Sequence, residues 1–222
     1  DMAVVYRFVL DQTDSGNGTI LVTNQLLDQY GITKEQLRAD AMENAPEIRP
    51  SEIRGMSEVM SELAPGMIPE VEPEDEQMFV ATVPDKIHGA GVIAYPNFME
   101  DAAQKMGGDF FVLPSSIHEV LLVKDNGQMT AKELENMVKE VNATQVEPAD
   151  QLTDHVYHYD SQNHIFELAD KYEERQREAE HDEPDKDSVL GDLKEKKQEI
   201  AKKDPAKDAA TKAATKKHEA SL

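Results

Sequence analysis

Two serines and a histidine lie close together in the segment Leu113–Val120, where His118 follows Ser115 and Ser116. A serine nucleophile needs a base within hydrogen-bond reach of its hydroxyl, and an imidazole can be that base. The segment lacks both Gly-x-Ser-x-Gly and Ser-x-x-Lys, the frames of known hydrolases. A turn whose hydroxyls bond free backbone groups is therefore the favoured interpretation. A hydrolase of unrecognised type, using Ser115 or Ser116 with His118 or His88, is the alternative.

Three further histidines, His155, His158 and His164, lie within ten residues, and imidazole is a common ligand of transition metals. If residues 155–159 form a strand, His155 and His158 point to opposite faces of the sheet. A hairpin could instead bring His158 and His164 face to face, so these two are the metal candidates. We favour polar tips of an exposed hairpin and expect no metal.

Two other patterns resemble ligand sites only in part. Acidic residues gather between residues 40 and 76, but the Asp-x-Asp-x-Asp-Gly spacing of a calcium loop is absent. Gly89-Ala90-Gly91 lacks the third glycine of a dinucleotide turn and precedes a predicted strand instead of following one. We therefore expect no cofactor.

The balance of charge restricts the class of partner. The 222 residues include 23 Lys and Arg against 45 Asp and Glu, a formal net charge of −22. A protein that binds phosphates needs a basic face, so direct binding of nucleic acid or of anionic membranes is disfavoured. The absence of cysteine excludes disulfides, thiolate metal sites and Cys nucleophiles, and no apolar run approaches the ~18 residues of a membrane span. We expect a cytoplasmic protein with a protein partner, in an oligomeric state that the sequence leaves open.

Apolar runs bounded by turn residues predict strands, the first of them buried. They cover residues 3–10, 19–22, 78–83, 92–95, 110–113, 119–123, 156–159 and 165–168. Capping residues and helical periodicity predict helices. These cover residues 25–30, 33–45, 51–63, 97–106 and 130–141, with an exposed loop over 64–76.

The order of these elements favours an α+β fold, with a mixed, largely antiparallel sheet and packed helices. The composition changes after Leu168: residues 1–168 hold 10 basic and 30 acidic side chains, and residues 169–222 hold 13 and 15. We predict an acidic α+β domain over 1–168, then a charged helical segment and a low-complexity disordered tail over 169–222. Because Asp1 directly precedes an apolar run, we expect 1–168 to be the C-terminal part of a larger domain or protein.

Three stretches carry a resemblance to a known family: residues 22–33, 82–92 and 113–120. They resemble a domain-of-unknown-function family abundant in gut Firmicutes, often carried near conjugative or other mobile elements, over residues 1 to about 168. A more remote likeness is to an uncharacterised family of Bacillus-type proteins. The resemblance implies an intracellular bacterial accessory protein whose family has no established activity. Together these features favour an interaction protein that is not an enzyme.

Overall fold

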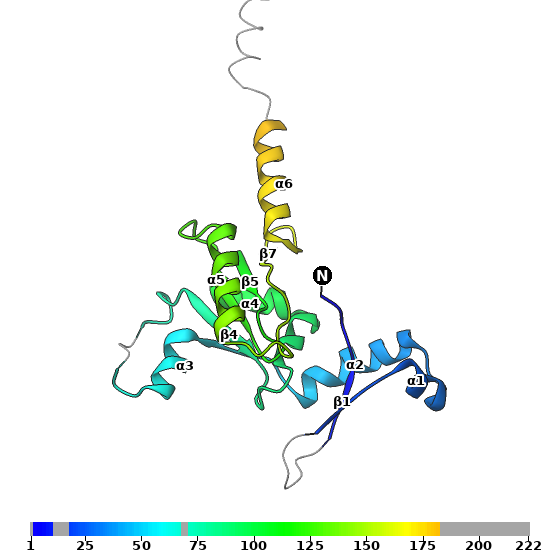
Figure 1. Cartoon of the computed structure of the whole chain (residues 1–222). Helices are drawn as coiled ribbons and strands as arrows, with labels where there is room; N and C mark the ends of the chain where they lie inside the picture. The colour runs from blue at the N-terminus through cyan, green and yellow to red at the C-terminus, as the bar shows by residue number, and fades with distance from the viewer. Residues whose placement is uncertain (1, 11–17, 68–70, 183–222) are drawn as a thin grey trace, which may run out of the picture. The chain divides into compact units, whose positions relative to one another are not determined.

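The computed structural model describes residues 2–10, 18–67 and 71–182, and their fold is α+β, as predicted (Figure 1). The chain divides into two compact units, Asp1–Tyr172 and Glu173–Leu222. The strands are β1 Arg7–Val9, β2 Thr19–Leu21, β3 Glu52–Gly55, β4 Met78–Thr82, β5 Phe110–Leu113, β6 Val120–Lys124, β7 Tyr157–Asp160 and β8 Ile165–Leu168. The helices are α1 Asn24–Tyr30, α2 Lys34–Ile48, α3 Met56–Leu63, η1 Gly89–Ala94, α4 Phe98–Met106, α5 Ala131–Thr144 and α6 Ala169–Asp182. Most of the predicted tail, residues 183–222, lies outside the described residues.

The larger of the two described sheets has six strands in the order β3-β4-β6-β5-β7-β8, and every neighbouring pair is antiparallel. Leu122 of β6 lies in register with Phe79 of β4 on one side and with Val112 of β5 on the other. The predicted closing hairpin is confirmed as β7 and β8. None of the helices in the described part of the chain is long and apolar enough to cross a membrane.

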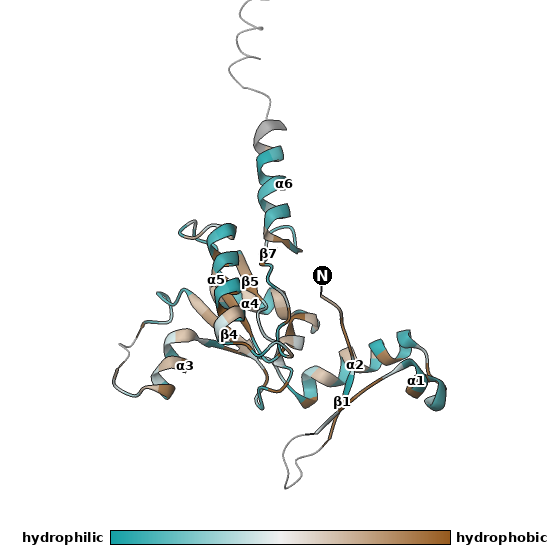
Figure 2. Ribbon diagram, in the orientation of Figure 1, coloured by the Kyte–Doolittle hydropathy of each residue, from teal (hydrophilic) through white to brown (hydrophobic). Residues whose placement is uncertain are grey.

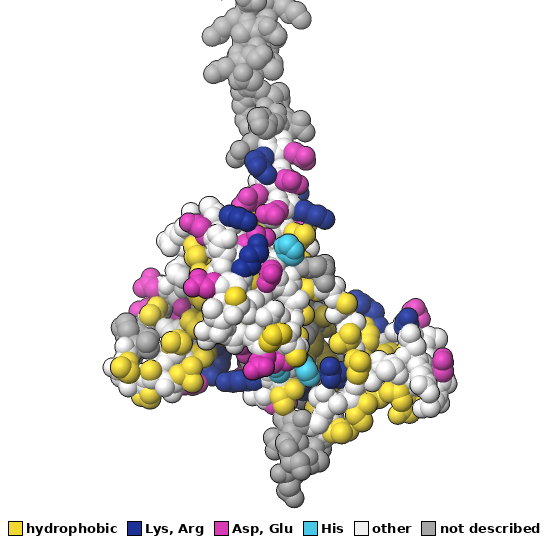
Figure 3. Space-filling view, viewed as in Figure 1, with side chains coloured by type: hydrophobic (Ala, Val, Ile, Leu, Met, Phe, Trp, Pro, Cys, Tyr) yellow, Lys and Arg dark blue, Asp and Glu magenta, His cyan; other side chains and the backbone are white. Residues whose placement is uncertain are grey.

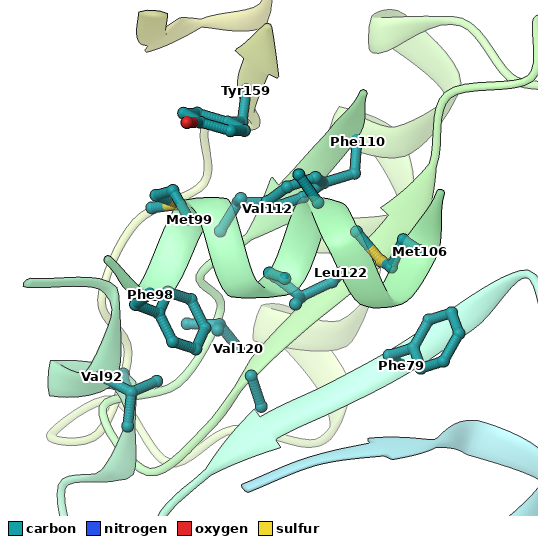
Figure 4. Close-up of a cluster of buried hydrophobic side chains, with 14 of the residues drawn as sticks. Phe79, Val92, Phe98, Met99, Met106, Phe110, Val112, Val120, Leu122 and Tyr159 are labelled. Carbon is teal, nitrogen blue, oxygen red and sulfur yellow. The ribbon is translucent and has the colours of Figure 1, made fainter. Parts of the chain in front are cut away.

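Both faces of this sheet are covered, because successive side chains of a strand point to opposite faces. On one face, Phe110, Val112 and Leu122 pack with α4 and η1 (Figure 4). On the other face, Phe111 and Leu113 pack with residues of α5. The continuous apolar run of β5 is explained by this burial, since all four of its residues are buried.

Three predictions about local structure are wrong, in whole or in part. Residues 92–95 are not a strand, because the turns of η1 extend from Gly89 to Ala94. The predicted helix over 51–63 begins only at Met56, since Glu52–Gly55 forms the edge strand β3 beside β4. The first apolar run forms β1, but all three residues of that strand are exposed.

The first part of the chain forms an N-terminal segment, which we define as residues 2–10 and 18–49. Its strands β1 and β2 pair with each other as a small antiparallel sheet, and in β1 the hydrophilic Arg7 is followed by two hydrophobic residues (Figure 2). Thr23 and Thr33 cap helices α1 and α2, each accepting a backbone N–H with its hydroxyl. Gly31 ends α1 in the left-handed conformation, as its type predicts. Helix α2 continues past Pro46, where the sequence predicted its end.

Helix α5 begins at a complete capping box, as the sequence predicted. The Thr130 hydroxyl accepts the Glu133 N–H, and the Glu133 carboxylate accepts the Thr130 N–H. The backbone and hydroxyl of Thr130 hold the pKa of Glu133 below its usual value. We expect Thr130→Ala to lower the free energy of unfolding by about 1 kcal/mol, measured by urea denaturation.

The matched control is Thr144→Ala at the other end of α5. The Thr144 hydroxyl only donates back to the carbonyl of Glu140 within the helix, a bond that contributes little to stability. An equal loss in the two variants would contradict the assigned role of the cap.

Candidate functional site

Two loops of the six-stranded sheet meet at one place, where histidines from each come together. One loop, residues 83–88, follows β4, and the other, residues 114–119, follows β5. The Ala90 N–H donates to Ile117 O across 3.2 Å, and the Thr82 hydroxyl donates to His118 O across 2.8 Å. Gly89 makes the close approach possible, because a Cβ there would fall less than 3.0 Å from two oxygen atoms of the other chain segments. Hydrogen bonds to two backbone oxygen atoms of residues 114–119 therefore hold this loop against the chain on either side of residues 83–88.

His88 and His118 stack with ring centroids 5.6 Å apart and planes inclined by 14°. Nδ1 of His118 lies 3.3 Å from the His88 amide nitrogen and 3.2 Å from Lys86 O, and its Nε2 lies 3.6 Å from an oxygen of Asp150. Burial, and then the nearby Arg7 and the His118 ring, lower the pKa of His88. The lowered pKa favours the neutral form of the His88 imidazole, and the backbone of His88 lies in the left-handed region at φ 53°.

Arg49 lies beside this pair and connects α2 to the loop after β4. Its guanidinium pairs with Asp85 and donates to Ile87 O, while Tyr95 donates its hydroxyl to Arg49 O across 3.1 Å. Burial works against the charge of Asp85, but the Arg49 guanidinium and the Ile87 N–H outweigh it and hold the pKa of Asp85 below its usual value. Among the described residues, none accepts a hydrogen bond from the buried Nε of Arg49.

These groups border a cavity of about 740 Å³ within the first unit. Its walls come from the N-terminal segment, from η1 and from three residues farther along the chain, Ile117, Leu152 and Phe166. His88, Arg49 and Tyr95 lie on the wall, whereas most other lining side chains are apolar. The size is typical of small-molecule sites, which span roughly 300–1,000 Å³. A mostly apolar wall with a few polar groups at one part of it is suited to binding a small molecule.

The serine candidates are buried beside this cavity but do not line it. Ser115 and Ser116 are 8% and 6% exposed, and the Ser116 hydroxyl accepts the backbone N–H of His118 across 3.0 Å. Among the hydrogen bonds between described residues, none joins either hydroxyl to the ring of His88 or His118. A serine hydroxyl that bonds a backbone N–H two residues later is typical of a turn.

The metal candidates lie on opposite faces of the sheet. His158 is fully buried, stacks on Tyr172 at 3.5 Å and places Nε2 3.0 Å from Asp125. His164 instead contacts the Tyr159 hydroxyl at 3.1 Å, and Tyr159 belongs to the core cluster on the α4 face. A face-to-face pair of His158 and His164 is therefore wrong, and the interpretation of His158 as an exposed tip is wrong as well. Within the described ranges, no three His, Asp or Glu side chains are grouped to hold a metal.

Sequence reasoning missed Arg49, Asp85 and Asp150 in this site. The Arg49–Asp85 pair spans 36 positions, and Asp150 comes from a loop after α5 whose Leu152 N–H bonds Ser115 O. No repeated spacing links these residues, so only the fold brings them together.

Comparison with known proteins gives one match. No curated protein and no solved structure matches this chain. A family model does match, over residues 1–161, and its description is a family of unknown function. These residues include both loops, the cavity wall up to Leu152 and the strands that position them. The chain therefore belongs to the family of unknown function DUF5688.

Proposed function

We propose that this chain is a non-enzymatic interaction protein that binds a basic protein partner through its N-terminal segment. The observation that carries the proposal is an apolar surface formed by Phe8, Ile20 and Tyr30, which we name the N-terminal apolar surface. Phe8 and Ile20 are cross-strand partners, and the Tyr30 ring meets the Phe8 ring edge-on at 6.1 Å. Their exposed fractions are 41%, 45% and 60%.

Exposed apolar side chains are concentrated in this segment. Of 14 large hydrophobic residues that are exposed among the described residues, nine lie between Val4 and Ile48. Figure 3 shows such side chains, in yellow, gathered over the N-terminal segment on the face drawn. Contiguous exposed apolar surface on a protein marks a site of interaction, since it lowers stability and solubility unless it is covered.

Charge complementarity supports a basic partner. Residues 1–168 hold 10 basic and 30 acidic side chains, a net of −20. A second copy of the chain brings the same excess of negative charge, so self-association is electrostatically disfavoured. A partner with a basic rim and an apolar centre matches both features.

The hydrolase alternative has less support. A hydrolase of this kind needs a serine hydroxyl within hydrogen-bond reach of an imidazole, inside a concave pocket. Neither Ser115 nor Ser116 lines the cavity, and the hydroxyl of Ser116 bonds the His118 backbone.

From the family resemblance we also propose that the chain is a cytoplasmic accessory protein of Firmicutes, encoded near mobile elements.

The test uses the full chain as bait and then a purified pair. Captured proteins are identified, produced separately and titrated against the bait by calorimetry. We expect a partner with a pI above about 9, bound less tightly as sodium chloride is raised. We expect Ile20→Thr combined with Tyr30→Gln to weaken binding at least about tenfold, since central apolar anchors carry most of the energy of an interface.

The matched control is Leu63→Gln, which removes an apolar side chain that is 76% exposed at the end of α3, outside the N-terminal segment. This variant should bind as the unchanged chain does. An acidic partner, or equal loss in the control, would overturn the proposal. So would a dimer in solution, seen by light scattering, that the Ile20 and Tyr30 substitutions dissociate.

A further inference from the structure

The cavity beside His88 has an apolar wall and a cationic part. Its apolar wall is built from side chains of α2, η1 and the later strands and loops, including Leu37, Ala41, Ile48, Ile93, Leu152 and Phe166. Of the three residues of the N-terminal apolar surface, Phe8 lines the cavity and Ile20 and Tyr30 do not, so the cavity and the proposed protein interface share one residue. An apolar wall of this extent favours a ligand with an apolar body, because burial of such surface drives binding.

The cationic part consists of Arg7 and Arg49, with the His88 imidazole near them. Arg49 is already paired with Asp85. Arg7 donates to the Thr19 hydroxyl across 3.0 Å, and in the described part of the chain no carboxylate pairs with it. Arg7 is also near enough to help lower the pKa of His88. One guanidinium at the cavity is therefore available to an anion.

Neither of two nearby carboxylates, Asp40 and Asp85, forms an ion pair with Arg7 in the described part of the chain. Asp40 lies on the wall and accepts the Gln36 side-chain amide across 2.8 Å. Asp85 is engaged by Arg49. The net charge of −20 over residues 1–168 disfavours ligands with several negative charges, since each adds repulsion. A single carboxylate matches one available guanidinium, which binds it with two parallel hydrogen bonds.

We propose that this cavity binds an amphipathic monocarboxylate of the fatty-acid class, with its carboxylate at Arg7 and its apolar chain along the wall formed by α2 and η1. The inference goes beyond the proposed protein interaction and rests on Arg7 and on the wall formed by α2 and η1, none of which belongs to the N-terminal apolar surface. No bond is made or broken in it.

The probe is dodecanoate, titrated by calorimetry into the full chain below the concentration at which it forms micelles. We expect one site per chain. Dodecan-1-ol has the same chain without the charge and should bind at least about tenfold more weakly, because a charge-assisted bond is lost. Dodecyltrimethylammonium, with a positive head, should bind more weakly still.

Two matched pairs of variants locate the site. Arg7→Gln should weaken dodecanoate about tenfold and leave dodecan-1-ol unchanged, whereas Arg38→Gln, in the same segment but off the cavity wall, should change neither. Ala41→Phe fills the cavity and should abolish binding of both probes, and Ala39→Phe, on the same helix but off the wall, should not. Circular dichroism checks that each variant is folded.

Three results would overturn the inference. The first is no binding of dodecanoate at all. The second is equal affinity for dodecanoate, the alcohol and the cation, which would indicate apolar adsorption without recognition of the head. The third is binding of several molecules per chain that Ala41→Phe does not reduce, which would place the probe on the exposed apolar surface.

Discussion

Replacing Gly89 by alanine is expected to lower the free energy of unfolding by about 3 kcal/mol, at the upper end of the usual cost of overpacking. A Cβ at Gly89 would collide with the Thr82 hydroxyl oxygen and the His118 carbonyl oxygen, and would lie 3.0 Å from Val83 N. The carbonyl and the amide belong to the backbones of two loops that are themselves hydrogen-bonded, so neither can move aside cheaply. The two loops would move apart, and the 2.8 Å hydrogen bond from the Thr82 hydroxyl to His118 O would be broken.

Gly91→Ala is the control, two residues farther along the same element. A Cβ at Gly91 would have no atom of the other described residues within 4 Å, so this variant should stay within about 1 kcal/mol of the unchanged chain. Urea denaturation followed by circular dichroism gives both values, and an unchanged m-value indicates that the same unfolding is compared. Equal stability of the two variants would show that the loops do not pack as described.

Local signals in the sequence predicted many elements of the fold correctly. Gly31 ends α1 and the Thr130–Glu133 pair opens α5, because each of these features depends only on residues within one turn of a helix. The strand β5 was predicted because a short apolar run bounded by glycines and a proline has few alternatives. These confirmed elements account for the α+β class.

Elements that depend on distant partners were predicted poorly. Ile53 was assigned to a helix because its spacing to Met56 and Met60 is helical, yet it pairs with Ala81 across the sheet. Periodicity alone cannot report a partner strand. Residues 92–94 of the apolar run 92–95 belong to η1 and not to a strand, because Gly89 packs against the loop after β5. This contact joins residues that are far apart in sequence.

The candidate site shows the same difference between features that are local in sequence and features that depend on distant residues. His88 and His118 were singled out by residue type, but the role given to them needed serine hydroxyls that the backbone already engages. Arg49 and Asp150 carried no local signal. The cavity itself is assembled from segments between Met2 and Phe166, so no window of sequence contains it.

Asp125→Ala is expected to lower the free energy of unfolding by about 2 kcal/mol at neutral pH, because it leaves a buried imidazole N–H without an acceptor. His158 is fully buried, and its Nε2 lies 3.0 Å from Asp125. Its Nδ1 is buried and has no hydrogen-bond partner within the part of the chain that the structure describes, so the proton that satisfies the ring belongs on Nε2, facing the carboxylate. Asp75→Ala, at an exposed turn before β4, is the control and should change stability by less than about 0.5 kcal/mol.

The effect of Asp125→Ala should also depend on pH, in a direction that the contacts determine. The hydrogen bond from His158 outweighs burial and holds the pKa of the Asp125 carboxyl below its usual value. The unfolded chain therefore binds this proton more readily than the folded one. Stabilisation by the pair is complete above about pH 4, the pKa of an aspartate in an unfolded chain. It is lost as the pH falls through the lower pKa of the folded state.

The measurement is urea denaturation of the unchanged chain and of Asp125→Ala between neutral and acidic pH. Other carboxylates titrate in both proteins, so their contributions cancel in the difference between the two free energies of unfolding. That difference should be constant near neutral pH and shrink in acid. A difference that grows as the pH falls would mean that the carboxylate destabilises its surroundings. The burial of His158 would then have to be stabilised by its stacking on Tyr172 and its edge-on contact with Phe111 alone.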